Sequence, residues 1–210
     1  MQPVAGAARA REVRAALLVE LFTLAYMLFE AAAALGIGLA TRSLSLETFG
    51  LDSLIEIASA LVLIWRLQLE RQGGESERIE PVERRAARFA GWGLLALALY
   101  VLFQSLYSLY VRAQPEASLW GVALAAASLV VMPALARLKL HYAERIGSGA
   151  LRADAIESLA CAYLALTLLL GLGANYLFGW WWADPVAALA MLYFIVREAR
   201  EALEEESERV

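Results

Sequence analysis

Six apolar segments, each long enough to cross a lipid bilayer, occupy most of this 210-residue chain. A spanning helix needs about 20 apolar residues, because it rises about 1.5 Å per residue through a hydrocarbon core about 30 Å thick. The segments are 15–40, 46–67, 89–111, 118–137, 150–173 and 183–199. They predict an all-α membrane protein, a six-transmembrane-helix bundle (3+3 helices) over residues 1–203, followed by a short acidic tail at 204–210.

Composition agrees with a membrane protein. Hydrophobic residues make up 61% of the chain, well above the share typical of a soluble globular domain. The single cysteine excludes an intramolecular disulfide. No small-residue cleavage site follows the first apolar segment, so we read that segment as a retained span.

The basic residues predict the orientation of the bundle. Of the 18 lysines and arginines, all but Arg42 and Arg112 gather at the two termini, around the connection 68–88, and between the fourth and fifth segments, where we place Lys139. Because cytoplasmic loops are rich in lysine and arginine, both termini are expected to be cytoplasmic. We expect a multi-pass integral protein of a prokaryotic inner membrane.

Two acids, Asp52 and Glu56, interrupt the second apolar segment. Residues four apart share a helix face, and this pair lies roughly 9 to 15 Å deep at about 1.5 Å per residue. An unpaired acid at that depth costs about 2.5–3.5 kcal/mol on insertion scales. A bound cation would relieve this cost, and so would protonation. The alternative is a protonated pair that hydrogen-bonds neighbouring helices.

The fifth segment carries a second pair, Glu157 and Cys161, again four residues apart. This segment runs opposite to the second one, so the two pairs are expected to lie level near the membrane midplane. Together with Asp52 and Glu56 they would form a cage of three carboxylates and one thiolate, which suits a tetrahedral divalent cation such as zinc. The alternative for Cys161 is a small apolar core residue.

Other acids receive separate interpretations. Glu30 shares a face with Tyr26 in the first segment, and the two are candidates for a proton or ion pathway; the alternative for Glu30 is a hydrogen-bonded buried carboxyl. Glu20 is expected to reach the membrane interface and to be structural. Asp154 and Asp184 lie near helix starts and are expected to cap them.

At these residues the chain resembles the cation diffusion facilitator family of divalent-metal/proton antiporters. "FGLDSLIEIASA" is similar to that family's second helix, which carries D-x-x-x-D. "SGALRADAIESLACAYLAL" is similar to its fifth helix, where an A-D-A-type entry precedes H-x-x-x-D. "WWWADPVAALAMLYFIVREAREAL" is similar to its sixth helix, which opens with Asp-Pro.

The resemblance implies metal efflux in a homodimer, with departures in detail. Glu56, Glu157 and Cys161 stand where the family has Asp, His and Asp, so its metal preference does not transfer. Family members usually carry a cytoplasmic metal-binding domain after the sixth helix, and this sequence does not include it. The connection 68–88 also contains no histidine, so no accessory cytoplasmic metal site is expected.

The function expected from the sequence is export of a divalent cation in exchange for protons, with the metal bound between the second and fifth helices. Zinc is the first expectation, with cadmium, cobalt, nickel, manganese and iron left open. The expected partners are lipid, metal and protons, without a resident cofactor. The alternatives are a non-transporting metal-binding or regulatory membrane subunit, and a small proton-coupled exporter of organic cations.

Two other functional classes are disfavoured. The sequence shows no nucleophile–base pair and no phosphate-cradling loop, so we expect no enzyme and assign no catalytic residue. Membrane topology explains the basic residues, so we expect no nucleic-acid binding.

Overall fold

The computed structural model describes residues 3–71 and 80–208, and this part of the chain forms six helices and no strand. They are α1 (Pro3–Thr41), α2 (Leu44–Arg71), α3 (Glu80–Val111), α4 (Leu119–Ile146), α5 (Gly149–Phe178) and α6 (Ala183–Glu208). The expected all-α bundle is confirmed. Residues 72–79, in the middle of the connection 68–88, lie outside the described residues, and Arg78 is among them.

The helices extend beyond the apolar spans expected from the sequence. α4 continues to Ile146 rather than stopping at 137, and α6 continues to Glu208, through most of the expected tail. These extensions are rich in Arg, Lys, Glu, Leu and Ala, which are good helix formers. A hydropathy profile detects only the part of each helix that suits lipid, so the helices are longer than the profile indicates.

Five of the six helices, α1 to α5, contain stretches long and apolar enough to cross a membrane, judged over the described residues. α6 does not meet that measure, because Asp184 lies near its start and Arg197, Glu198 and Arg200 lie just past its middle. Five strongly apolar helices therefore indicate a multi-pass membrane bundle. α6 has a shorter apolar stretch and packs against them.

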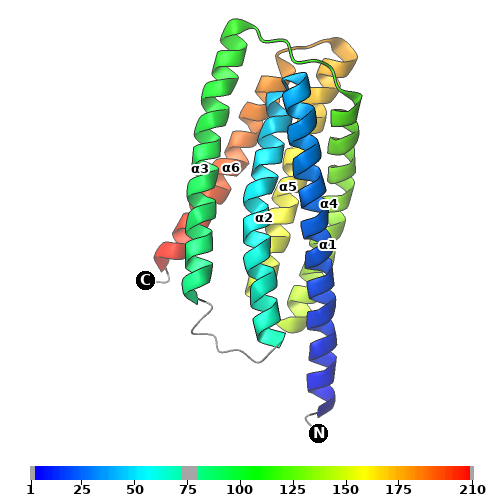
Figure 1. The fold of residues 1–210 in the computed structure, drawn as a ribbon, viewed down its shortest axis with the longest axis vertical. Coiled ribbons are helices and arrows are strands. Elements are labelled where there is room, and N and C mark those ends of the chain that lie inside the picture. Colours follow the sequence, from blue (N-terminus) through cyan, green and yellow to red (C-terminus); the bar gives the residue numbers. More distant parts are fainter. Residues whose placement is uncertain (1–2, 72–79, 209–210) are drawn as a thin grey trace.

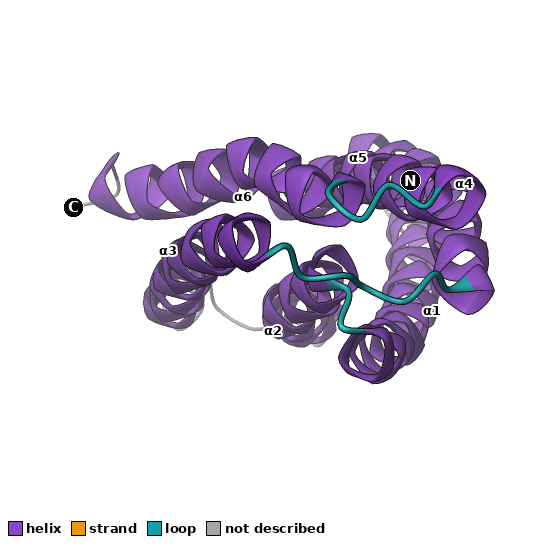
Figure 2. Ribbon diagram, turned by 90° about the horizontal axis from the view of Figure 1, so that it is seen from above, coloured by secondary structure: helices purple, strands orange, loops and turns teal. Residues whose placement is uncertain are grey.

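The six helices form two layers of three, seen clearly from above (Figure 2). One layer contains α3, α2 and α1, and the other contains α6, α5 and α4. α2 contacts α1, α3, α5 and α6, which makes it the most central helix of its layer. Figure 1 shows the helices roughly side by side along the long axis of the bundle. Polar side chains on the inner face of α2 therefore point toward the other layer.

The surface of the bundle is apolar, as expected for contact with lipid. Many large hydrophobic side chains on its outside are more exposed than buried, among them Leu18, Phe22, Phe29, Phe103, Leu170 and Leu177. An apolar exterior of this extent would be a liability in water. In hydrocarbon it is the favoured surface, so the buried acids of the interior become the unusual feature of the molecule.

A tight turn fixes α5 against α4. Gly147 ends α4 in the left-handed conformation at φ 67°, where a glycine pays no Cβ penalty. Ser148 follows at once and caps α5, since its side chain accepts a hydrogen bond from the backbone N–H of Leu151. The short connection places α5 antiparallel to α4.

The carboxylate of Asp184 connects the start of α6 with the start of α2. It lies in the first turn of α6, and its carboxylate accepts hydrogen bonds from Ser43 and Ser45 side chains at 2.5 Å each and from the backbone N–H of Leu44 at 2.8 Å. Asp184 therefore lies in the first turn of α6, as expected, but the hydrogen bonds of its carboxylate are made to groups at the start of α2. The bonds tie the N-terminal end of α6 to the start of α2.

Candidate metal centre

Asp52 and Glu56 lie on the inner face of the central helix α2. Asp52 is 0% exposed and Glu56 is 9% exposed. The helical repeat explains why both face inward, because positions i and i+4 lie one above the other on the same side. The sequence predicted that these acids share a face, and the structure shows them buried inside the bundle.

A third acid, Glu198 of α6, meets this pair. Oxygen atoms of Asp52, Glu56 and Glu198 that could bind a metal all lie within 4.8 Å of one another. We call these three residues the acid trio. α2 and α6 are in contact, and both helices start at the same end of the bundle (Figure 1). The trio thus joins the two layers across the interior.

Four of the trio's carboxylate oxygens have no hydrogen-bond donor within the described part of the chain. Both carboxylate oxygens of Asp52, Oε1 of Glu56 and Oε1 of Glu198 are buried and accept no hydrogen bond there. A buried polar group without a partner is costly, and a buried charge is more so. Three acids that face one another also repel when ionised. This arrangement is stable with protons on the acids or with a cation among them.

The second predicted pair, on α5, lies beside the trio rather than within it. α5 contacts α2, and Glu157 is half-buried and interacts electrostatically with Glu56 and Glu198. Cys161 is fully buried, and its thiol donates a hydrogen bond to Glu30 Oε1 at 3.7 Å. The structure brings Asp52 and Glu56 together as predicted, and the third close acid comes from α6.

Glu30 is the centre of a hydrogen-bonded cluster next to the trio. Its carboxylate accepts hydrogen bonds from the side chains of Ser53 at 3.1 Å, of Ser128, and of Cys161. The Tyr26 hydroxyl lies 3.0 Å from Ser128 Oγ. We call these five residues the Glu30 cluster. Because Ser53 directly follows Asp52, the cluster extends from α1 to the edge of the trio.

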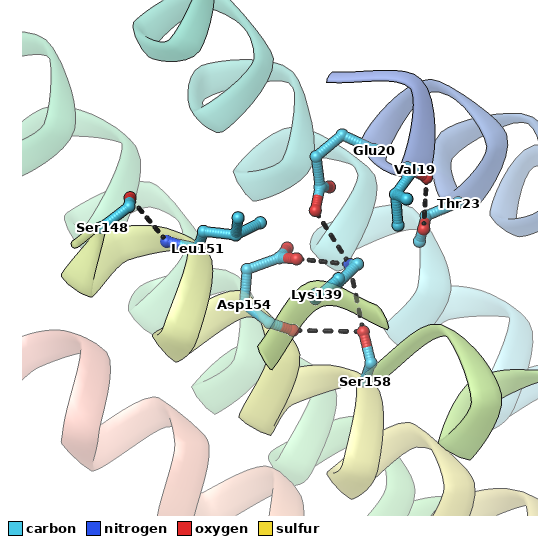
Figure 3. Close-up of polar contacts among 8 residues, drawn as sticks. All are labelled: Val19, Glu20, Thr23, Lys139, Ser148, Leu151, Asp154 and Ser158. Carbon is cyan, nitrogen blue, oxygen red and sulfur yellow. Dashed lines mark hydrogen bonds and ion pairs between the residues drawn. The ribbon is translucent and has the colours of Figure 1, made fainter. Parts of the chain in front are cut away.

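A second group of buried acids surrounds Lys139 of α4 (Figure 3). The ammonium nitrogen lies 3.5 Å from Glu20 Oε1, forms an ion pair with Asp154, and donates to Ser158 Oγ at 3.1 Å. We call these four residues the Lys139 cluster. It joins α1, α4 and α5, and Lys139 is only 1% exposed.

This cluster corrects three expectations from the sequence. Lys139 does not lie in a polar connection, because α4 continues past it. Glu20 does not reach the interface, since it is 0% exposed. Asp154 does not cap α5, because Ser148 is the cap and Asp154 pairs with Lys139. For Lys139 and Glu20 the error has one origin, because residues near the end of an apolar run were assumed to be solvated; for Asp154, a position near a helix start was taken to mean a capping role.

Glu198 was missed for a similar reason. It stands between charged neighbours, Arg197 and Arg200, at the end of the last apolar run, which suggests a solvated helix end. A weak signal was present in the spacing. Met191, Ile195 and Ala199 are buried at helical intervals, and Glu198 lies three residues after Ile195, on nearly the same face.

Comparison with known proteins gives a consistent result. A family model described as the cation efflux transmembrane domain matches residues 18–208. An uncharacterised transporter from Synechocystis sp. is 26% identical over 170 residues, which are 79% of this chain and 54% of that protein. The chain thus spans about half the length of this relative. The matched family region includes every residue of the trio and of the two clusters.

Proposed function

Because this chain belongs to the cation efflux transmembrane family, we propose that it exports a divalent metal cation across the membrane in exchange for protons. The supporting observation is that Asp52 and Glu56 are buried and largely without hydrogen-bond partners. Both are buried on the central helix, and three of their four carboxylate oxygens accept no hydrogen bond in the described part of the chain. Acids inside a membrane bundle are expensive and generally mark an ion or proton pathway.

Exchange follows from competition at these carboxylates. A metal requires deprotonated ligands, so protons and metal exclude each other from the same oxygens. A carboxylate that releases a metal toward the proton-rich side gains a proton there. The protonated acid is neutral and is tolerated in the interior. The return step therefore carries protons, and the inward proton gradient drives outward metal movement.

The arrangement of the helices suits alternating access. Each half of the chain supplies one layer of three helices (Figure 2), and the middle helices α2 and α5 are in contact. Transporters built from two such halves commonly bind substrate between them near the midplane. A small rocking of one layer on the other would open the acids first to one side and then to the other.

Glu30 and Tyr26 fit the role of proton carriers in this scheme. Tyr26, Ser128 and Glu30 form a continuous chain of hydrogen-bonding groups that ends beside Asp52. Every member can donate or accept, as transfer of a proton requires. On α5, Glu157 is the candidate for a further ligand that joins Asp52 and Glu56 during the cycle, while Cys161, the fourth ligand expected from the sequence, donates its thiol hydrogen to Glu30 in this structure.

The test is transport by purified protein in lipid vesicles that contain a metal-sensitive dye. With an imposed pH gradient, the wild type should move metal, and the double variant Asp52→Asn, Glu56→Gln should show only the leak of empty vesicles. Glu47→Gln is a matched control, because Glu47 lies on the same helix and accepts a hydrogen bond from Tyr100 at 3.0 Å, away from the trio. Equal flux from wild type and double variant would contradict the proposal.

A further inference from the structure

We infer that Glu198 of α6 is a direct ligand of the transported cation, so that the binding centre is an all-carboxylate site selective for a divalent cation that prefers oxygen, of the Mn²⁺ type. This inference rests on the proposed function and adds to it. It extends the site from the two helices favoured by the sequence to a third, and it replaces a mixed oxygen and sulfur donor set by oxygen alone.

The spacing of the three acids is that of ligands around one ion. Oxygens bound to a common divalent cation at about 2.0–2.6 Å lie at most about 4–5 Å apart. The candidate oxygens of the trio all lie within 4.8 Å of one another, so one ion can contact all three residues with little side-chain movement. Two separate helices, α2 and α6, supply them.

The unpartnered oxygens provide an independent argument. Asp52 is 0% exposed and neither of its oxygens accepts a hydrogen bond in the described residues, while one oxygen each of Glu56 and Glu198 is in the same condition. The buried acids with a structural role have compensation from the chain: Asp184 is bonded to hydroxyl and N–H groups, and Glu20, whose oxygens also accept no hydrogen bond within the described ranges, has the Lys139 ammonium 3.5 Å away. Carboxylate oxygens that lie close together and accept no hydrogen bond are suited to binding a cation that is not part of the chain.

Two cations among the described residues, Arg197 and Lys139, interact with the trio electrostatically, and neither forms an ion pair with it. Arg197 precedes Glu198, but its side chain is 55% exposed and pairs with Glu201 at 2.6 Å. Lys139 interacts electrostatically with Glu56, yet its ion pairs are with Glu20 and Asp154. Glu198 therefore turns into the bundle while the arginine beside it turns out.

Close packing against α3 fixes the part of α6 that carries Glu198. A Cβ atom placed on Gly91 of α3 would lie 2.7 Å from Leu203 Cγ and 3.3 Å from the backbone oxygen of Ala199. Only a residue without a side chain lets the two helices approach this closely. The turn that follows Glu198 is thereby held against α3, which holds the carboxylate toward α2.

The donor atoms determine the kind of ion. Carboxylates suit Mg²⁺, Ca²⁺ and Mn²⁺, whereas thiolates select softer ions such as Zn²⁺ and Cd²⁺. The one thiol of the sequence, Cys161, donates its hydrogen to Glu30. The trio and Glu157 beside it offer carboxylate oxygens, while Cys161, which also interacts electrostatically with the three acids, has its thiol hydrogen bonded to Glu30. Zinc, expected from the sequence because of Cys161, is thus less favoured by this donor set than manganese.

The experiment measures Mn²⁺ and Cd²⁺ binding to the purified full chain in detergent, by calorimetry at constant pH. Glu198→Gln keeps the size of the side chain and should weaken Mn²⁺ binding at least about tenfold, the loss seen even for groups that merely orient a ligand. Glu201→Gln, one turn further on the exposed side of the same helix, should bind Mn²⁺ as the wild type does. Cys161→Ser should leave Mn²⁺ affinity within a factor of about two, small against a tenfold step.

The outcomes separate this inference from the proposed function. Wild-type affinity in Glu198→Gln, with binding lost in Asp52→Asn, would overturn the role of Glu198 and leave the proposed function standing. Tighter binding of Cd²⁺ than of Mn²⁺, abolished by Cys161→Ser, would overturn the all-carboxylate site. Absence of metal binding by the wild type, together with absence of flux in vesicles, would overturn both.

Discussion

The acid trio and the Lys139 cluster are two buried groups of acids in one bundle, and they differ in a single respect. Around Lys139, the carboxylates of Glu20 and Asp154 have a cation supplied by the chain itself. In the trio, the carboxylates of Asp52, Glu56 and Glu198 lie close together, and no cation of the described residues is paired with them. The first group has charge balanced by a cation of the chain, although the oxygens of Glu20 accept no hydrogen bond in the described part of the chain, and the second needs protons or an ion to balance its charge.

This difference separates structure from transport. A buried ion pair holds helices in a fixed relation, because breaking it leaves an uncompensated charge in the interior. Unpaired acids contribute little to holding the bundle together, but they can exchange what they bind. The Lys139 cluster joins α1, α4 and α5, while the trio joins α2 and α6. The comparison predicts opposite responses to mutation at the two places.

The largest effect is expected from Lys139→Met. Removal of the ammonium leaves Glu20 and Asp154 buried without a cation, which should lower the free energy of unfolding by about 3–5 kcal/mol. Thermal unfolding in detergent measures this. The triple variant that also carries Glu20→Gln and Asp154→Asn should recover most of the loss. An unchanged unfolding temperature in Lys139→Met would show that the cluster does not stabilise the bundle.

A smaller effect is expected from metal at the trio. A saturating concentration of Mn²⁺, about 100 times its dissociation constant, should stabilise the wild type by about 2.7 kcal/mol. Asp52→Asn should lose this response, yet without metal it should be as stable as the wild type or more so, because a repulsion has been removed. A marked loss of metal-free stability in Asp52→Asn would mean that the trio, like the Lys139 cluster, is structural.

The pH dependence of Mn²⁺ affinity tests whether protons compete with metal at the trio. Because protons compete with metal for the carboxylates, Mn²⁺ affinity should fall as pH falls, by about 1.4 kcal/mol per pH unit for each proton displaced. Calorimetry between pH 8 and pH 6 gives the slope. Glu198→Gln should show a shallower slope than the wild type, since one competing acid is gone. Affinity independent of pH would argue against exchange of metal for protons.

The smallest effect is expected at the surface. Arg145 pairs with Glu12 at 2.6 Å, and the arginine side chain is 52% exposed. An exposed ion pair contributes no more than about 1 kcal/mol, so Arg145→Gln should barely change the unfolding temperature. It serves as the matched control for Lys139→Met, because both substitutions remove one positive charge from α4. A large loss would show that burial is not the cause of the Lys139 effect.

The sequence predicted the helices and the first two acids because both depend on local regularities. Apolar length identifies a span, and the four-residue spacing places Asp52 and Glu56 on one face. Their inward orientation could be predicted because exposing an acid to lipid at that depth is energetically costly.

The remaining contacts depend on how helices distant in sequence are rotated and packed. Glu198 meets α2 in a part of α6 that also packs closely against Gly91 of α3, and no spacing within α6 encodes that packing. Lys139 lies beyond the apolar run of its helix, where a hydropathy profile indicates solvent, but α1 and α5 cover it there. A residue at the end of an apolar run can therefore be buried by its neighbours.

The most direct test of the acid trio as the ion-binding centre is anomalous diffraction from crystals of the protein grown with Mn²⁺. The account predicts one strong peak about 2.0–2.6 Å from oxygens of Asp52, Glu56 and Glu198. The same experiment on Glu198→Gln should weaken or remove that peak. A peak beside Cys161 and Glu157, with Glu198 out of reach, or no peak among the three acids, would contradict it.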